Sequence, residues 1–114
     1  MNSIITYKYN LKLNTIIGKL NESKSKTLFV INKEKQLIGA ITDGDIRRAI
    51  LKKNGLKIKI NEIINYKPVL INDNLSFEKI SFLFKNYSIK AIPFVNNKKE
   101  IKKIIHYSEL KKLK

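Results

Sequence analysis

The 114-residue sequence contains an internal repeat in which elements of the first half recur 64 or 65 residues later. Phe29-Val30 corresponds to Phe94-Val95, and the segment 37–46 corresponds to 101–110. The expected order of elements is helix, strand, turn, strand, helix in both halves. Because neither half is long enough to bury its apolar strands alone, the repeat predicts two copies packed about an approximate twofold axis.

In the first half, residues 1–13 form a lead-in whose alternating apolar positions favour a strand or an extended arm. Asn14 is a good helix N-cap, and the helix after it is expected to end near Ser23. Gly39 lies within the second of two expected strands and indicates a close approach of another backbone. The expected strands are 28–31 and 37–41, a second helix begins near Gly44, and its stop signals are Lys52, Lys53, Asn54 and Gly55. The expected buried helix positions are Ile16, Ile17, Leu20, Ile46, Ala49, Ile50 and Leu51.

The second half begins with a linker over 56–66, in which Asn61–Ile64 is expected to form one helical turn. Pro68 is expected to open a strand at 69–71, and Asp73 or Asn74 to cap the next helix. The inner positions of that helix are Ile80, Leu83, Phe84 and Tyr87. The remaining expected elements are strands at 91–95 and 101–105, a turn at 96–100 and a terminal helix from about Tyr107.

The formal net charge of +15 suggests an anionic partner, but its distribution argues against a dedicated nucleic-acid surface. Only Arg47 and Arg48 among the 24 basic residues are arginine, and the lysines are scattered over turns and termini. The abundant Lys, Asn and Ile are typical of an A/T-rich coding sequence. We therefore favour a solvated cationic surface, which still suits anionic ligands such as nucleotides.

Composition also excludes several classes of protein. There are no cysteines, so the sequence offers no disulfide, thiol nucleophile or thiolate metal site. There is no apolar run of about 18 residues and no secretory signal pattern, so the expected location is the cytoplasm, away from the membrane. Since Met1 begins the sequence and Lys114 follows closely on the last motif, we expect it to be the amino-terminal part of a longer polypeptide.

The junction between strand and helix at 42–45 is the strongest candidate site. Thr42-x-x-Asp45 fits a capping box, so these two residues could simply begin a helix. Three features favour a ligand instead. Asp43-Gly44 is a turn-forming pair, both arginines follow within one helical turn, and the repeat places His106 and Glu109 at the same spacing.

Different residues at this junction could bind different parts of a nucleotide. The Thr42 hydroxyl and the first N–H groups of the helix could hold a phosphate, and Arg47 or Arg48 could neutralise its charge. The Asp45 carboxylate suits a ribose diol, since it can accept from two hydroxyls. The strand residues that could sandwich a base are Ile41, Phe29 and Ile92.

The string from Gly39 to Asp45, GAITDGD, resembles the CBS domain, named after cystathionine β-synthase, and the repeat resembles a tandem CBS pair or Bateman module. The resemblance spans about residues 10–110, and 91–95 looks like the Ile-Pro-Val strand of the family's second copy. It implies an α/β (α+β) fold of two pseudo-twofold related β-α-β-β-α repeats packed through their sheets, at 1–56 with the lead-in and at 57–114. The ligand-binding residues that it implies are Ile41, Thr42, Asp43, Gly44, Asp45, Arg47 and Arg48. A second candidate site would use Ile92, Pro93, His106 and Glu109.

The resemblance further implies a regulatory module that binds AMP, ADP or ATP and pairs into a homodimer. The longer string from Gly39 to Ala49 is similar to CBS pairs of sugar-phosphate nucleotidyltransferases and arabinose-5-phosphate isomerases. His106 replaces the expected Thr, Glu109 the expected Asp and Lys103 the expected Gly. The second site is therefore expected to be empty, altered or structural.

Three alternatives to a nucleotide sensor remain. The chain could be a ligand-free dimerisation or interaction module in which Thr42 and Asp45 only cap a helix. It could be a basic nucleic-acid binder, which we consider less favoured. An autonomous enzyme is least favoured, because the sequence contains no visible catalytic residues, whether as a nucleophile–base pair or as a cluster of metal ligands.

Overall fold

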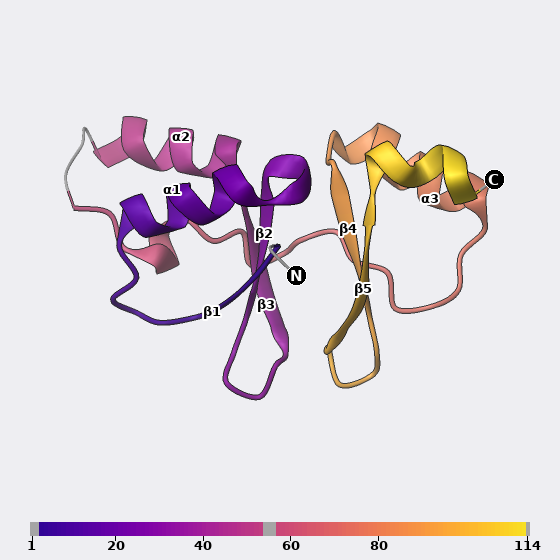
Figure 1. The fold of residues 1–114 in the computed structure, drawn as a ribbon, viewed down its shortest axis with the longest axis horizontal. Coiled ribbons are helices and arrows are strands. Elements are labelled where there is room, and N and C mark those ends of the chain that lie inside the picture. The colour runs from indigo at the N-terminus through magenta and orange to yellow at the C-terminus, as the bar shows by residue number, and fades with distance from the viewer. Residues whose placement is uncertain (1–2, 54–56, 114) are drawn as a thin grey trace.

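The fold consists of two similar halves that lie side by side along the longest axis of the molecule (Figure 1). The structure is a computed structural model that describes residues 3–53 and 57–113. The molecule measures 44 × 28 × 22 Å. The expected stop signals Asn54 and Gly55 and the expected repeat boundary at residue 56 lie outside the described residues.

The first half is a three-stranded sheet with helices on one side (Figure 1). Strand β1 pairs in parallel with β2, and β2 pairs antiparallel with β3. Its elements are β1 (Ile4–Thr6), α1 (Leu13–Glu22), the 3₁₀ turn η1 (Lys24–Lys26), β2 (Thr27–Ile31), β3 (Leu37–Thr42) and α2 (Asp43–Lys53).

The second half repeats this order around an antiparallel pair of strands. Its elements are η2 (Ile60–Glu62), α3 (Phe77–Tyr87), β4 (Ala91–Val95), β5 (Ile101–His106) and the 3₁₀ helix η3 (Tyr107–Leu113). The helical turn expected within the linker is thus present as η2, one residue earlier than its expected start. The terminal helix begins at Tyr107 as expected, but it is a 3₁₀ helix.

The two hairpin turns have the same hydrogen bonds, which shows the repeat at atomic detail. Asn32 Oδ1 accepts from the Gln36 N–H at 2.8 Å, and Asn96 Oδ1 accepts from the Glu100 N–H at 2.9 Å. Lys35 and Lys99 both adopt left-handed backbone, with φ of 66° and 65°. The two hairpins also contact each other next to their turns, because the Leu37 N–H donates to the Lys99 carbonyl at 2.7 Å.

The halves pack through their sheets, which confirms the predicted fold class. Each half has an apolar core between its strands and its helices, built around Leu28 and Ile41 in the first and Ile92 and Phe84 in the second. A third cluster joins β2 and β3 to β4 and consists of Phe29, Leu37, Ala40, Ala91 and Val95. Packing the two halves together buries this shared apolar surface, which favours their association.

The close approach predicted at Gly39 is confirmed. A Cβ atom there would overlap Cγ2 of Ile64 and come within 2.7 Å of the Asn65 carbonyl oxygen. The approach brings Asn65 into register with Ala40, and the two residues exchange backbone hydrogen bonds of 3.0 and 2.9 Å. Gly39 therefore allows the segment after η2 to run beside β3.

Several local predictions are wrong. Helix α1 begins at Leu13 with no side-chain cap, so Asn14 lies inside the helix. Helix α3 is capped by Ser76, whose Oγ accepts from the Lys79 N–H at 3.2 Å, so Asp73 and Asn74 lie outside the cap. The strand expected at 69–71 is reduced to a parallel bridge between Ile71 and Phe94, whereas the lead-in, expected as a strand or an extended arm, forms a strand at 4–6 within its described residues 3–13.

The predicted buried faces of two helices extend too far. In α2, Ile46 and Ala49 are buried, but Ile50 and Leu51 are 38% and 71% exposed. Tyr87 in α3 is also exposed. Each helix turns only one stripe toward its sheet, so an apolar residue beyond that stripe remains in solvent. Within the described residues, no helix is long and apolar enough to cross a membrane.

Candidate functional site

A cleft of about 800 Å³ opens beside the junction of β3 and α2 and is lined by both halves of the chain. The first half contributes the junction and the rim between α1 and β2. The second half contributes the segment after η2 and the end of α3. The lining residues are Ser25, Lys26, Thr27, Phe29, Ala40, Thr42, Asp43, Gly44, Asp45, Arg48, Asn65, Lys67, Pro68, Val69, Tyr87, Ser88, Ile89, Lys90 and Ala91. A cleft of this size suits a small-molecule ligand.

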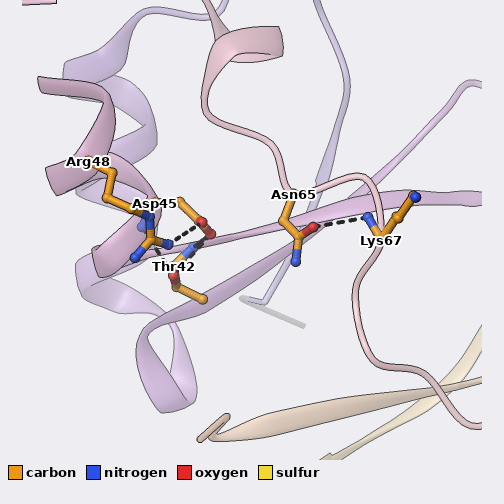
Figure 2. Close-up of polar contacts among 5 residues, drawn as sticks. All are labelled: Thr42, Asp45, Arg48, Asn65 and Lys67. Carbon is orange, nitrogen blue, oxygen red and sulfur yellow. Dashed lines mark hydrogen bonds and ion pairs between the residues drawn. The ribbon is translucent and has the colours of Figure 1, made fainter. Parts of the chain in front are cut away.

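The predicted capping box is present at the edge of this cleft (Figure 2). The Thr42 N–H donates to Oδ2 of Asp45 at 2.9 Å, and the Asp45 N–H donates to Oγ1 of Thr42 at 3.3 Å. These two bonds satisfy backbone groups at the start of α2, which have no partners within the helix. The capping interpretation of Thr42 and Asp45 is therefore correct as far as the helix is concerned.

The Asp45 carboxylate makes two further hydrogen bonds. Oδ2 accepts from the Thr42 hydroxyl at 3.0 Å, and Oδ1 accepts from the Arg48 guanidinium at 2.7 Å. The side chain of Asp45 is 16% exposed, whereas that of Arg48 is 72% exposed. Arg48 can therefore leave Asp45 without unfolding the helix, and the oxygen that it covers would then be free to accept from a ligand.

Asn65 and Lys67 extend the site on the segment next to the junction (Figure 2). Asn65 is held by its backbone pairing with Ala40, and its side-chain oxygen accepts from the Lys67 N–H at 3.0 Å. This arrangement is a small local turn that places a lysine at the cleft. No local sequence pattern indicated that this turn would lie at the cleft, because its position depends on the close approach at Gly39.

The cleft combines an apolar floor with a cationic border. The floor and walls include Phe29, Ala40, Val69, Ile89 and Ala91. The border carries four basic residues, Lys26, Arg48, Lys67 and Lys90, against two acids, Asp43 and Asp45. Such a cleft can take a ligand with an apolar aromatic part and an anionic part.

Most of the residues predicted at the first site are brought together by the fold. Thr42, Asp43, Gly44, Asp45 and Arg48 line the cleft. Asp43 and Gly44 belong to the first turn of α2, so the helix begins one residue before its expected start near Gly44. An added Cβ at Gly44 would lie 3.2 Å from Nη1 of Arg48, so the missing side chain leaves room for that guanidinium.

Ile41 and Arg47 do not line the cleft. Successive strand residues point to opposite faces, so Ala40 and Thr42 face the cleft while Ile41 is fully buried in the first core. Arg48 shares a helix face with Asp45, three residues away, whereas Arg47 is exposed on another face.

The second junction differs from the first. Ile92 and Pro93 are fully buried in the fold. Nδ1 of His106 lies 2.8 Å from Oγ of Ser25, and Oε2 of Glu109 lies 3.0 Å from Nζ of Lys24. Burial lowers the pKa of His106, and nearby Lys24 lowers this pKa further, while Glu109 opposes both effects. Within residues 3–53 and 57–113, no cluster of His, Asp and Glu side chains could hold a metal ion.

The comparison of sequences finds a match to a known family in the first half of the chain. Residues 1–52 match the family model of the CBS domain. An uncharacterized protein of Helicobacter pylori is 27% identical over 97 residues, which cover 83% of this chain and 29% of that protein. Protein RP505 of Rickettsia prowazekii is 34% identical over 91 residues, which cover 80% of this chain and 28% of that protein. The chain thus spans less than a third of the length of these two relatives.

The comparison of structures identifies the fold of the whole chain as that of a CBS domain pair. The CBS domain pair of protein MJ0100, solved with 5′-methylthioadenosine and S-adenosyl-L-methionine, has a TM-score of 0.75 and 21% identity, covering 96% of this chain and 86% of that one. CBSX2, solved with AMP, has a TM-score of 0.73 and 19% identity, with the same coverage. Both neighbours hold ligands that contain adenosine.

Proposed function

We propose that this chain is a regulatory, non-catalytic CBS pair that binds one adenine nucleotide, such as AMP, ADP or ATP. The observation that carries the proposal is the cleft beside the Thr42–Asp45 capping box. It offers a carboxylate, a helix N-terminus, an apolar floor and a cationic border within one volume of about 800 Å³. The adenosine ligands of the neighbouring MJ0100 and CBSX2 structures support the same class of ligand.

Each part of the nucleotide has a counterpart in the cleft. The Thr42 hydroxyl and the first-turn N–H groups of Asp43 and Gly44 would hold the phosphate, because a helix N-terminus favours an anion. Asp45 would accept from the ribose hydroxyls, and Arg48 would move from Asp45 to the phosphate. Phe29 and Ala40, which line the cleft, offer an apolar surface to the adenine.

Titration calorimetry with AMP, ADP and ATP tests this proposal. We expect saturable binding to the wild-type protein, and a loss of at least roughly tenfold in affinity for Asp45→Ala, the usual cost of a lost charged hydrogen-bond partner. Arg47→Ala is the matched control, since Arg47 lies on the same helix outside the cleft. No saturable binding by the wild type, or equal binding by Asp45→Ala, would contradict the proposed site.

The proposal extends to the assembly in which the chain acts. The string from Gly39 to Ala49 favours an attached or partner sugar-phosphate nucleotidyltransferase or arabinose-5-phosphate isomerase, and the relatives are more than three times as long as the aligned region. We further propose a cytoplasmic homodimer of CBS pairs. Light scattering coupled to size-exclusion chromatography should give twice the 13.3 kDa chain mass, and a monomer at all concentrations would contradict the dimer.

A second candidate is a ligand-free interaction module. The observation that favours it is that both oxygens of Asp45 already have partners within the chain, Thr42 and Arg48. If these contacts serve only the helix, Asp45→Ala should lower stability, and added nucleotide should leave the melting temperature of both proteins unchanged. Stabilisation of the wild type by AMP, lost in the variant, would favour the nucleotide sensor instead.

A further inference from the structure

The second junction of the repeat is bound to the rim between α1 and β2. His106 and Glu109 in this junction correspond to Thr42 and Asp45 of the first junction. His106 contacts Ser25 through Nδ1 and Oγ, 2.8 Å apart, and Glu109 contacts Lys24 at 3.0 Å. The polar groups that could serve a second ligand are therefore engaged with the first half of the chain.

The repeat itself shows how this differs from the open cleft. The residues 64 positions after Lys24 and Ser25 are Ser88 and Ile89, and both line the cleft together with Asp45 and Thr42. Ile89 has no polar side-chain atom to offer Thr42. At the first junction, the space between Thr42 and Asp45 on one side and Ser88 and Ile89 on the other is thus part of the open cleft. At the second junction, side-chain contacts within the chain bridge the corresponding space.

The rim that His106 contacts has an unusual backbone. Ser25 and Lys26 are consecutive and both left-handed, with φ of 66° and 47°. Non-glycine residues rarely adopt this region, and they persist there when surrounding contacts hold them. Ser25, Lys26 and Thr27 all line the cleft of the first junction. The contact with His106 therefore acts on a wall of that cleft.

We infer that the second junction binds no nucleotide of its own and that His106 holds the Ser25–Thr27 rim in the shape that the first cleft needs. His106 is thus a positioning residue for a ligand that it does not touch, and the chain binds one nucleotide, not two. The inference rests on the proposed function, because the shape of the rim affects affinity only if the cleft binds a ligand.

The burial of these side chains indicates that His106 contributes more than Glu109 to holding the rim in place. His106 is 8% exposed, so the histidine side of its contact with Ser25 is buried, while Ser25 is partly exposed at the cleft. The side chains of Lys24 and Glu109 are 52% and 41% exposed, and an ion pair between such side chains contributes little. We therefore attribute the position of the rim to the contact between His106 and Ser25, and not to the exposed salt bridge.

Calorimetric titration with AMP tests the inference through affinity and stoichiometry together. We expect one AMP per wild-type chain, and a roughly three- to tenfold weaker affinity for His106→Leu, the effect of one lost side-chain hydrogen bond. Ser25→Ala should weaken binding equally, and the double variant no further, because both changes remove the same contact. Ser25→Ala also keeps the test valid if His106→Leu fails to fold.

Two controls separate positioning from general stability. His106→Asn can keep a polar atom near the position of Nδ1 and should restore affinity to within about twofold of the wild type. Ser108→Ala changes an exposed residue of η3 and should bind AMP as the wild type does. In nucleotide-free protein, the amide resonances of Ser25 and Lys26 should shift in His106→Leu and remain in place in Ser108→Ala.

The outcomes distinguish this inference from the proposed function. Absence of AMP, ADP and ATP binding by the wild type would overturn the proposed function, and the positioning role with it. Two nucleotides per wild-type chain, or unchanged affinity in His106→Leu and Ser25→Ala, would overturn the inference alone and leave the nucleotide site in place.

Discussion

The Arg48 guanidinium donates to Oδ1 of Asp45 at 2.7 Å, so an ion pair spans the first turn of α2 at the edge of the cleft. Asp45 is also the carboxylate that closes the capping box with Thr42. One acid therefore serves the helix through Oδ2 and an exposed arginine through Oδ1. Under the proposed function, this division would allow the arginine to exchange Asp45 for a ligand phosphate while the helix keeps its cap.

Arg48→Ala should weaken AMP binding by roughly tenfold but should not weaken adenosine binding, since only the phosphate would lose a charged donor, whereas Oδ1 of Asp45 would lose a competitor for the ribose. The exposed ion pair contributes less than about 1 kcal/mol, so the stability of the fold should change little. Calorimetry with AMP and adenosine measures both affinities, and Arg47→Ala is the control. Equal losses for the two ligands would argue against a phosphate contact.

Thr42→Ala should lower the free energy of unfolding by about 1 kcal/mol, because α2 loses its N-cap side chain. Ser76→Ala removes the cap of α3 and should have a similar cost. Urea denaturation measures both losses. Only Thr42→Ala should also weaken AMP binding, since Ser76 does not line the cleft; equal AMP affinities in the two variants would leave Thr42 with a capping role alone.

Gly39→Ala should destabilise the fold by about 1–3 kcal/mol, because its Cβ meets Ile64 and the Asn65 carbonyl. The change should also displace Asn65 and Lys67 and weaken nucleotide binding. Gly18→Ala is the opposite control: an added Cβ has no neighbour within 4 Å there, so the helix should gain about 0.5–1 kcal/mol. Thermal unfolding shows whether each substitution lowers or raises the stability of the protein. Unchanged stability in Gly39→Ala would contradict the close approach.

Acidification should destabilise the protein through His106. Burial and Lys24 lower the pKa of His106 in the folded state below its ordinary value of 6.5. The unfolded chain therefore binds the proton first, so this contribution is complete above pH 6.5 and is lost as the pH falls through the lowered pKa. Urea titrations from pH 8 to pH 5 should show a steeper loss for the wild type than for His106→Asn. Parallel curves would contradict the prediction.

Local patterns predicted the elements well but their boundaries less well. Asp73, Asn74 and Ser76 are all good capping residues within four positions, and local propensity does not choose among them. Ser76 caps α3 because the helix begins where its apolar face, with Ile80 and Phe84, meets the second core. Similarly, Leu51 continues an apolar run but lies beyond the stripe that α2 turns toward its sheet.

The residues of the candidate site also fall into those that local spacing could predict and those that it could not. Thr42, Asp45 and the two arginines belong to one helix start, so spacing alone predicted that Thr42 and Asp45 would lie near Arg47 or Arg48, and the structure shows that the arginine is Arg48. Asn65 and Lys67 reach the cleft only through the approach at Gly39. The end of α3 reaches it through the packing of the two halves. The ligand-binding role of all these residues stays a prediction that the experiments above address.

The sequence by itself determined the repeated order of elements, the shared turn geometry and the capped start of α2, because each depends on residues a few positions apart. The tertiary structure alone decided that Ser25 would meet His106, that Ile41 would face the core, and that both halves would line one cleft. These relations depend on which face each strand buries and on how two apolar sheets pack. Neither follows from local spacing, since contacts between residues as distant as 25 and 106 exist only once the cores have formed.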